Sequence, residues 1–333
     1  MVYFESLLIA ERRSKMAENT SNVSDTKINK EDFSWRAGWV DGVIALITVL
    51  GNMLVILLIL TRASLRTKQN WFVLSLAVAD FLVAAIVFPL RLVIGYSNFG
   101  KIKIFIGTTH DFLLYASTLN LCVLTLDRYL YIVYPMKYMC WKRKTSLIKT
   151  SLVAWIVAFF IPHSGLLIYL YVENTEVEKN FILFVLCFET VPCLCLPTAY
   201  LHILYFVRRQ KAQMKMQMRQ VQHNYVVTEN PEKYQTSKRS KILVLGGVIV
   251  FFVLSNVVHI TRAWLKYLLS TPILNKTFSR TSYFLIHANS AINVFVYGLF
   301  KEDFRREMKR VFCKRTFAPS ISQPAAAAHI ELQ

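Results

Sequence analysis

The chain contains seven separate stretches with almost no charge, each close to the ~20 residues that an α-helix needs to cross a bilayer. Lipid offers no hydrogen-bond partners, so stretches of this kind must satisfy their backbone groups internally, as helices. The sequence therefore predicts an all-α membrane protein, a seven-transmembrane helix bundle. The expected spans are Gly42–Leu60, Trp71–Leu90, Ile104–Leu126, Leu152–Tyr171, Phe181–Val207, Ile242–Ile260 and Tyr283–Phe300.

The overall composition excludes the common soluble classes. Apolar residues make up 55% of the chain and charged residues 18%, against roughly 45–50% and about 25% in an average soluble domain. A compact soluble domain of 333 residues has too little interior for so much apolar sequence. A soluble globular enzyme, a disulfide-stapled secreted module and a disordered protein are therefore excluded.

The basic residues are concentrated between the spans. The chain has 39 Lys and Arg against 20 Asp and Glu, a formal charge of +19. The loops after the first, third and fifth spans are basic, whereas residues 171–180 (YVENTEVEKN) are net negative. Because basic loops stay in the cytoplasm, we expect a multi-pass plasma-membrane protein with its N-terminus outside and its C-terminus inside. This distribution favours a membrane topology over nucleic-acid binding.

The segments outside the bundle have distinct expected roles. Phe304, Met308 and Phe312 recur every four residues among basic ones, which is the pattern of an amphipathic helix on the inner leaflet. The expected division is an extracellular tail (1–38), the bundle (39–300), an amphipathic membrane-surface helix (301–313) and a disordered cytoplasmic tail (314–333).

Three sites of modification or processing stand out in these segments. Asn19 and Asn22 begin Asn-x-Ser/Thr sequons on the outer side and are candidate glycosylation sites. Cys313 follows the amphipathic helix and is either a palmitoylation site or a free cytosolic thiol. Translation can start at Met1 or at Met16, and the sequence leaves both open.

Polar residues inside the spans indicate a buried site. Asp80 lies in the middle of the second span, and an ionisable group at that depth costs several kcal/mol, so it must face the bundle interior. Asn289 and Asn293 lie four residues apart on one face of the seventh span, and Ser117 of the third span can reach the same centre. These groups form either a hard-cation site, with Na⁺ favoured, or a hydrogen-bonded network that ties the helices together.

A set of short motifs, in order and one per expected helix, resembles the rhodopsin-like (class A) G-protein-coupled receptors. The pattern is nearest to that of the amine-type receptors. The matching residues are Gly51-Asn52, Leu76–Asp80, Asp127-Arg128-Tyr129, Trp155, Pro197 with Tyr205, Asn293 with Tyr297, and a short helix beginning near Phe304.

The resemblance implies roles for individual residues. Arg128 is the expected switch arginine, restrained by Asp127 and released toward the G protein on activation. Tyr205 and Tyr297 are expected to move inward to support it, and Phe252 to act as the aromatic pivot of helix six. The resemblance also assigns the Asp80 cluster as the family's allosteric sodium pocket.

The implied function is that of a cell-surface receptor without catalytic chemistry. Such a receptor converts the binding of an extracellular small molecule, with a cationic amine as one candidate, or of a short peptide into activation of a heterotrimeric G protein. Arrestin and membrane lipids are further expected partners, and no cofactor beyond Na⁺ is expected. Retinal is excluded because the seventh span has no lysine. The alternative is a seven-span transporter or channel, but the inverted repeats of transporters are not visible.

The chain departs from the family pattern at several positions. Lys103 stands where the family usually has the cysteine that is bonded to the second outer loop. The usual Cys-Trp-x-Pro of helix six is replaced by residues 255–258 (SNVV), and the proline of helix seven by Val294. A reduced kink in helix six and the loss of the tryptophan toggle are expected.

Helical geometry locates the expected ligand pocket. His110 lies eighteen residues before Arg128, which is five turns at about 3.6 residues per turn, so both point inward. Leu114 is one turn below His110, and Asp111 is rotated by about 100° toward a neighbouring helix. Amine receptors carry an aspartate at the position of His110, so Glu189 in helix five is the candidate counter-ion for a cationic ligand.

The predicted pocket is polar and contains three histidines. Several of its members can instead pair with one another, and a metal ion held by the histidines is a further alternative that no ligand motif supports. The candidate ligand-binding residues are His110, Asp111, Leu114, Glu189, His259, Arg262, Tyr283 and His287.

Overall fold

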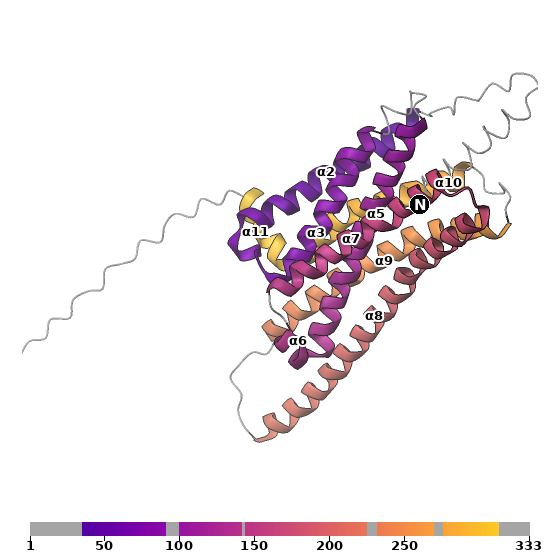
Figure 1. The fold of residues 1–333 in the computed structure, drawn as a ribbon. Helices are drawn as coiled ribbons and strands as arrows, with labels where there is room; N and C mark the ends of the chain where they lie inside the picture. The colour runs from indigo at the N-terminus through magenta and orange to yellow at the C-terminus, as the bar shows by residue number, and fades with distance from the viewer. Residues whose placement is uncertain (1–34, 91–99, 142–143, 225–231, 270–275, 313–333) are drawn as a thin grey trace, which may run out of the picture.

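The computed structural model describes residues 35–90, 100–141, 144–224, 232–269 and 276–312. Seven long helices run side by side in one bundle, which confirms the predicted fold class (Figure 1). The elements are α2 (Trp35–Thr61), η1 (Ala63–Leu65), α3 (Lys68–Leu82), η2 (Val83–Val87), α5 (Gly100–Val133), α6 (Pro135–Trp141), α7 (Lys144–Tyr171), α8 (Thr175–Asn224), α9 (Glu232–Leu269), α10 (Lys276–Phe300) and α11 (Glu302–Phe312). The turn η2 is π-helical and continues α3 toward Leu90.

Membrane-spanning character is visible in the composition of most of these helices. Five are long and apolar enough to cross a bilayer, and α10 qualifies together with α11, which is bent from it by 81°. The mean hydropathy of α5 is lower than that of these helices, because α5 carries several buried polar residues. They are Thr108, His110, Asp111, Ser117 and Asn120. The helix packs against α3, α7 and α8, so these polar groups meet protein and not lipid.

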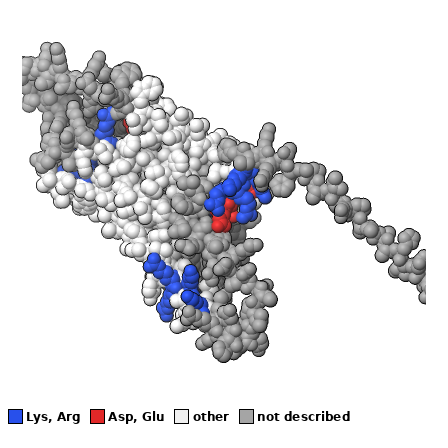
Figure 2. Space-filling view, turned by 180° about the vertical axis from the view of Figure 1, so that it is seen from behind, with Lys and Arg blue, Asp and Glu red and all other residues white. Residues whose placement is uncertain are grey.

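The outside of the bundle is apolar. On α7, Leu152, Ile156 and Phe160 are all more than half exposed, as expected for side chains that face lipid. Figure 2 shows charged side chains gathered toward the ends of the molecule, with an uncharged band between them. This band is where the hydrocarbon core of a membrane fits.

Hydrogen bonds between polar side chains connect three of the helices. The Trp155 Nε1–H of α7 donates to the Ser75 hydroxyl of α3 at 2.9 Å. The Ser75 and Ser151 hydroxyl oxygens lie 2.8 Å apart, and the Ser151 hydroxyl donates to the side-chain amide oxygen of Asn120 on α5 at 3.1 Å. Such bonds hold membrane helices together where hydrophobic burial does not.

The amphipathic helix α11 packs on the bundle. Phe304 is buried with its ring 6.4 Å from that of Tyr297, and Met308 contacts the same core. The nearly buried Glu307 accepts a hydrogen bond from the Ser64 hydroxyl of η1 at 2.9 Å. Phe304 thus packs on protein and not on lipid, whereas Met308 is only partly covered, and the position of α11 at the inner leaflet stays a prediction.

Several sequence-based predictions fall outside the described residues. They concern the candidate glycosylation sites Asn19 and Asn22, the candidate lipidation site Cys313 and the two tails.

Candidate functional site

Asp80 lies at the centre of a buried polar cluster between α3, α5 and α10. One carboxylate oxygen, Oδ1, accepts hydrogen bonds from the hydroxyls of Ser117 and Ser290, both at 2.8 Å. The other oxygen, Oδ2, accepts a hydrogen bond from the Asn293 amide at 2.9 Å. Asp80 is fully buried, so these three donors provide the compensation that a carboxylate at this depth requires.

The cluster differs in one member from the predicted set. Ser290, which the sequence analysis did not single out, holds the position expected for Asn289. The side-chain oxygen Oδ1 of Asn289 is buried and accepts no hydrogen bond from a described residue, and Asn289 lines the neighbouring cavity. The missed signal was the three-residue spacing between Ser290 and Asn293, which places both on one helical face.

A second polar cluster surrounds Glu189 in the outer half of α8. The Tyr115 hydroxyl of α5 donates a hydrogen bond of 2.6 Å to Glu189 Oε1. His259 Nε2 of α9 lies 3.5 Å from Glu189 Oε2, and His259 Nδ1 lies 3.4 Å from the Ser282 hydroxyl of α10. Glu189 therefore connects α8 with α5 and α9, and His259 extends the cluster to α10. Tyr115 and Ser282 were not predicted from the sequence.

The remaining predicted pocket residues form two further pairs. The Nε2 atoms of His110 and His287 lie 3.3 Å apart, between α5 and α10. The Arg262 guanidinium lies 5.1 Å from the centre of the Tyr283 ring, which is a cation–π distance. Asp111 is completely buried, and its carboxylate lies 3.5 Å from His110 Nδ1.

A cavity in the bundle joins the Glu189 cluster to the Asp80 cluster. It reaches from Glu189 and His259 down to Ser117 and Ser290, with Asn256 between the two levels. Asn256 occupies the place where the resemblance expects a tryptophan, and its smaller side chain leaves this passage open. The other lining residues are Leu114, Tyr115, Thr118, Phe188, Pro192, Phe252, Ile286 and Asn289.

Three of the eight predicted ligand residues line this cavity. They are Leu114, Glu189 and His259. Phe252, the predicted pivot, lines it as well and is buried.

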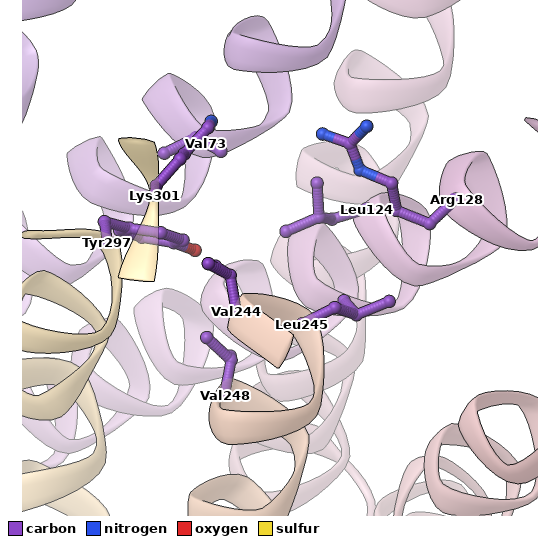
Figure 3. Close-up of a pocket in the computed structure, with 8 residues that line it drawn as sticks. All are labelled: Val73, Leu124, Arg128, Val244, Leu245, Val248, Tyr297 and Lys301. Atoms are coloured by element: carbon purple, nitrogen blue, oxygen red, sulfur yellow. The ribbon is translucent and has the colours of Figure 1, made fainter. Parts of the chain in front are cut away.

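Two of the predicted switch residues, Arg128 and Tyr297, line a second cavity near the end of the bundle at which α5 and α10 end. Arg128 and Tyr297 lie on opposite sides of it, with Leu124 and Val244 between them (Figure 3). The Tyr297 hydroxyl is buried and makes no hydrogen bond to a described residue. An open space beside a buried hydroxyl and a buried guanidinium is suited to rearrangement of α5, α9 and α10.

In this conformation Asp127 contacts a tyrosine of α6, and Tyr205 lies on the outside of the bundle. Asp127 accepts a hydrogen bond of 2.8 Å from the Tyr138 hydroxyl of α6, and no ion pair joins it to Arg128 among the described contacts. Tyr205 is 61% exposed and stacks on His202 at 6.5 Å, so it does not face the interior. Tyr129 follows Asp127 and Arg128 in the motif of helix three, and the centre of its ring lies 5.5 Å from the centre of the same His202 ring.

A bundle of seven helices with buried polar clusters and a cavity in its outer half defines the class of seven-transmembrane receptors. The sequence profile of the family described as "7 transmembrane receptor (rhodopsin family)" matches residues 51–297. The chain belongs to this family.

Three relatives illustrate the similarity. The chain is 39% identical to an alpha-2 adrenergic receptor of Labrus ossifagus over 127 residues, which cover 37% of this chain and 29% of that receptor. It is 25% identical to dopamine receptor 1 of Drosophila melanogaster over 318 residues, 82% of this chain and 61% of the relative. It is 26% identical to melatonin receptor type 1A of Phodopus sungorus over 323 residues, 87% of each chain. The chain thus spans less than two thirds of the length of the first two relatives.

Proposed function

We propose that this protein is a cell-surface receptor that converts the binding of an extracellular small molecule into activation of a heterotrimeric G protein. The single observation that carries the proposal is the arrangement of two cavities in one bundle. One is lined by the Glu189 and His259 side chains, and the other by Arg128 and Tyr297. A ligand in the first changes the packing of α5, α8, α9 and α10, and three of these helices, α5, α9 and α10, also line the second.

A cationic amine is the ligand class that the site supports best. Glu189 is a nearly buried carboxylate on the cavity wall, and a desolvated charge of this kind favours a charged, hydrogen-bonding partner. The names of two relatives, an adrenergic and a dopamine receptor, refer to amines. In this chain the proposed counter-ion is Glu189 of α8. The resemblance places His110, which is not an acid, at the position where amine receptors carry an aspartate.

The Asp80 cluster supports a role for Na⁺ as an allosteric ion. A carboxylate and two hydroxyl oxygens converge there, and hard cations take oxygen ligands. The same groups also form hydrogen bonds with one another, which fits the alternative of a network that ties the helices together. Exchange of Na⁺ for a large organic cation, with agonist affinity as the readout, distinguishes the sodium site from the structural network.

Signalling requires the cytoplasmic end to meet a G protein, with arrestin as a further partner. The basic residues of the loops after the first, third and fifth spans support an orientation with this end in the cytoplasm. Five apolar helices of membrane length support a multi-pass protein of the plasma membrane.

The proposal is tested by expressing the chain in cells with a promiscuous G-protein reporter and a panel of biogenic amines. We expect a saturable response to at least one amine, lost in Arg128→Ala at equal surface expression. Amine-driven uptake or current that persists without any G protein would contradict the proposal and favour the transporter or channel.

A further inference from the structure

A positively charged side chain is buried between α9 and α10. Arg262 of α9 is only 9% exposed. Its Nη1–H group donates a long hydrogen bond of 3.4 Å to the Ser279 hydroxyl of α10, and its guanidinium carbon lies 5.1 Å from the centre of the Tyr283 ring. A hydroxyl and an aromatic ring carry no negative charge, so these two contacts do not neutralise the arginine.

One edge of the Arg262 guanidinium is not used by these contacts. The Nε atom is buried and makes no hydrogen bond to a described residue. In the described part of the chain, no carboxylate forms an ion pair with Arg262. A buried charge is unfavourable unless an opposite charge and hydrogen bonds compensate for it. An anion that binds at this edge would provide both.

Arg262 continues the wall of the cavity that contains Glu189. Phe252, Asn256 and His259 of α9 all line this cavity and recur every three or four residues, which places them on one helical face. Arg262 follows His259 by three residues and is the next position on that face. The rise per residue puts it about 4.5 Å beyond His259 along the helix axis.

The contacts across to α10 confirm this order. The Ser282 hydroxyl lies 3.4 Å from His259 Nδ1, and Ser279, three residues earlier on α10, contacts Arg262. His259 in turn lies 3.5 Å from the Glu189 carboxylate. A carboxylate and a guanidinium are thus held at neighbouring levels of one helix face, with no ion pair between them in the described structure.

These two charges are complementary to the two ends of a zwitterion. A carboxylate binds an ammonium group, and a guanidinium binds a carboxylate through two parallel N–H···O bonds. Arginine suits this recognition because its N–H groups form a rigid, planar fork. Ser279 takes up the Nη1–H group of Arg262, and the fork formed by Nε and Nη2 makes no hydrogen bond to a described residue.

We propose that Arg262 binds a carboxylate of the ligand, so that the receptor recognises an amino acid or a similar small zwitterion in preference to a simple amine. The inference rests on the proposed function, because it takes Glu189 as the counter-ion of the ammonium group. An amino acid fits the arrangement, since its two charged groups are attached to the same carbon atom and can be bound at neighbouring levels of the pocket.

The test compares each common amino acid with the amine that differs from it only by loss of the carboxylate, as tyrosine differs from tyramine. Affinity is measured from the rise in Tm of the purified full-length chain with ligand concentration, because a ligand of the folded state stabilises it. We expect at least one amino acid to bind more tightly than its amine, by about 10- to 150-fold, which is the contribution of a charge-assisted hydrogen bond.

Three variants assign this difference to the guanidinium. Arg262→Gln should remove the advantage of the amino acid and leave the affinity for the paired amine unchanged. Arg262→Lys keeps the charge but loses the planar fork, so it should restore only part of the advantage. Arg280→Gln is the matched control, because it removes the same charge from an exposed position of α10 and should bind both compounds as the wild type does.

A measurement without ligand separates binding from a role in folding. Arg262→Gln removes a buried charge that has no carboxylate partner among the described residues, so its Tm should equal or exceed that of the wild type. A clear fall in Tm would show that the contacts with Ser279 and Tyr283 make Arg262 a structural residue, and would overturn the proposal.

Two further results would overturn the proposal. One is a panel in which no amino acid binds more tightly than its amine, and the other is an equal loss of both compounds in Arg262→Gln. If amines still activate the G-protein reporter in either case, the proposed function stands without this inference. Amino-acid binding that depends on Arg262 but produces no reporter response would support the inference and contradict the proposed signalling.

Discussion

The Glu189 carboxylate of α8 lies 3.5 Å from the Nε2 atom of His259 on α9. Both side chains line the cavity in the outer half of the bundle. A cationic ligand that enters here competes with His259 for the same carboxylate. The proposed function therefore predicts that binding is coupled to the separation of α8 and α9, and α9 also contributes Val244, Leu245 and Val248 to the cavity at Arg128.

Replacement of Glu189 tests the counter-ion. A charge-assisted hydrogen bond contributes roughly 1.5–3 kcal/mol, so Glu189→Gln should weaken the potency of an amine agonist by about 10- to 150-fold. Dose–response curves at matched surface expression provide the measurement. Asp111→Asn serves as the comparison and should have the smaller effect. A larger loss in Asp111→Asn would place the amine at α5, as in conventional amine receptors.

Replacement of Asp80 tests the sodium hypothesis. Asp80→Asn removes the only formal charge from the cluster, so agonist affinity should no longer respond to exchange of Na⁺ for a large organic cation. Ser290→Ala should reduce the response, because its hydroxyl bonds to the Asp80 carboxylate. Radioligand competition in the two salts is the measurement. An identical salt response in wild type and Asp80→Asn would show that the cluster is a structural network.

Replacement of Arg128 separates signalling from folding. Arg128 is buried beside the cavity that it shares with Tyr297 and makes no ion pair with another described residue. Arg128→Ala should reach the cell surface and bind agonist but lose agonist-stimulated nucleotide exchange. Ligand binding and exchange are measured on the same membranes. Normal exchange in this variant would remove Arg128 from the switch.

Replacement of Gly246 tests the close packing of α8 on α9. A Cβ atom added at Gly246 would overlap the Tyr200 hydroxyl group, so the Tyr200 side chain or the helix must shift. Overpacking of this kind costs about 1–3 kcal/mol, and Gly246→Ala should lower the Tm of the purified receptor.

Gly42→Ala is the control for this prediction. Its Cβ atom would meet Phe88 at 3.7 Å, an ordinary van der Waals distance, so its Tm should stay near that of the wild type. The smaller side chain of Tyr200→Leu should restore the stability of Gly246→Ala. A Tm loss of the same size in both glycine variants would point to backbone effects and not to the Tyr200 contact.

Much of the fold follows from properties that are local in the sequence. The spans are determined by length and hydropathy, because each helix must satisfy its own backbone hydrogen bonds in lipid. The inward position of Asp80 follows equally, since a carboxylate cannot face hydrocarbon. Its hydrogen bonds to Ser117 and Asn293 join residues that the sequence had grouped.

Local properties of the sequence did not predict which side chains contact one another. Ser290 contacts Asp80 where Asn289 was expected, and Tyr115 binds Glu189 without having been singled out. Tyr200 of α8, which lies beside Gly246 of α9, was not singled out either.

The sequence by itself thus determined the number of helices, their membrane-spanning character and the inward position of residues such as Asp80. The tertiary structure decided which side chains meet, including the contact between His110 and His287. The physical reason is geometric. Neighbouring residues differ by about 100° around a helix, so a small rotation of one helix exchanges one partner for the next. That rotation is set by packing between helices, which involves residues far apart in the chain.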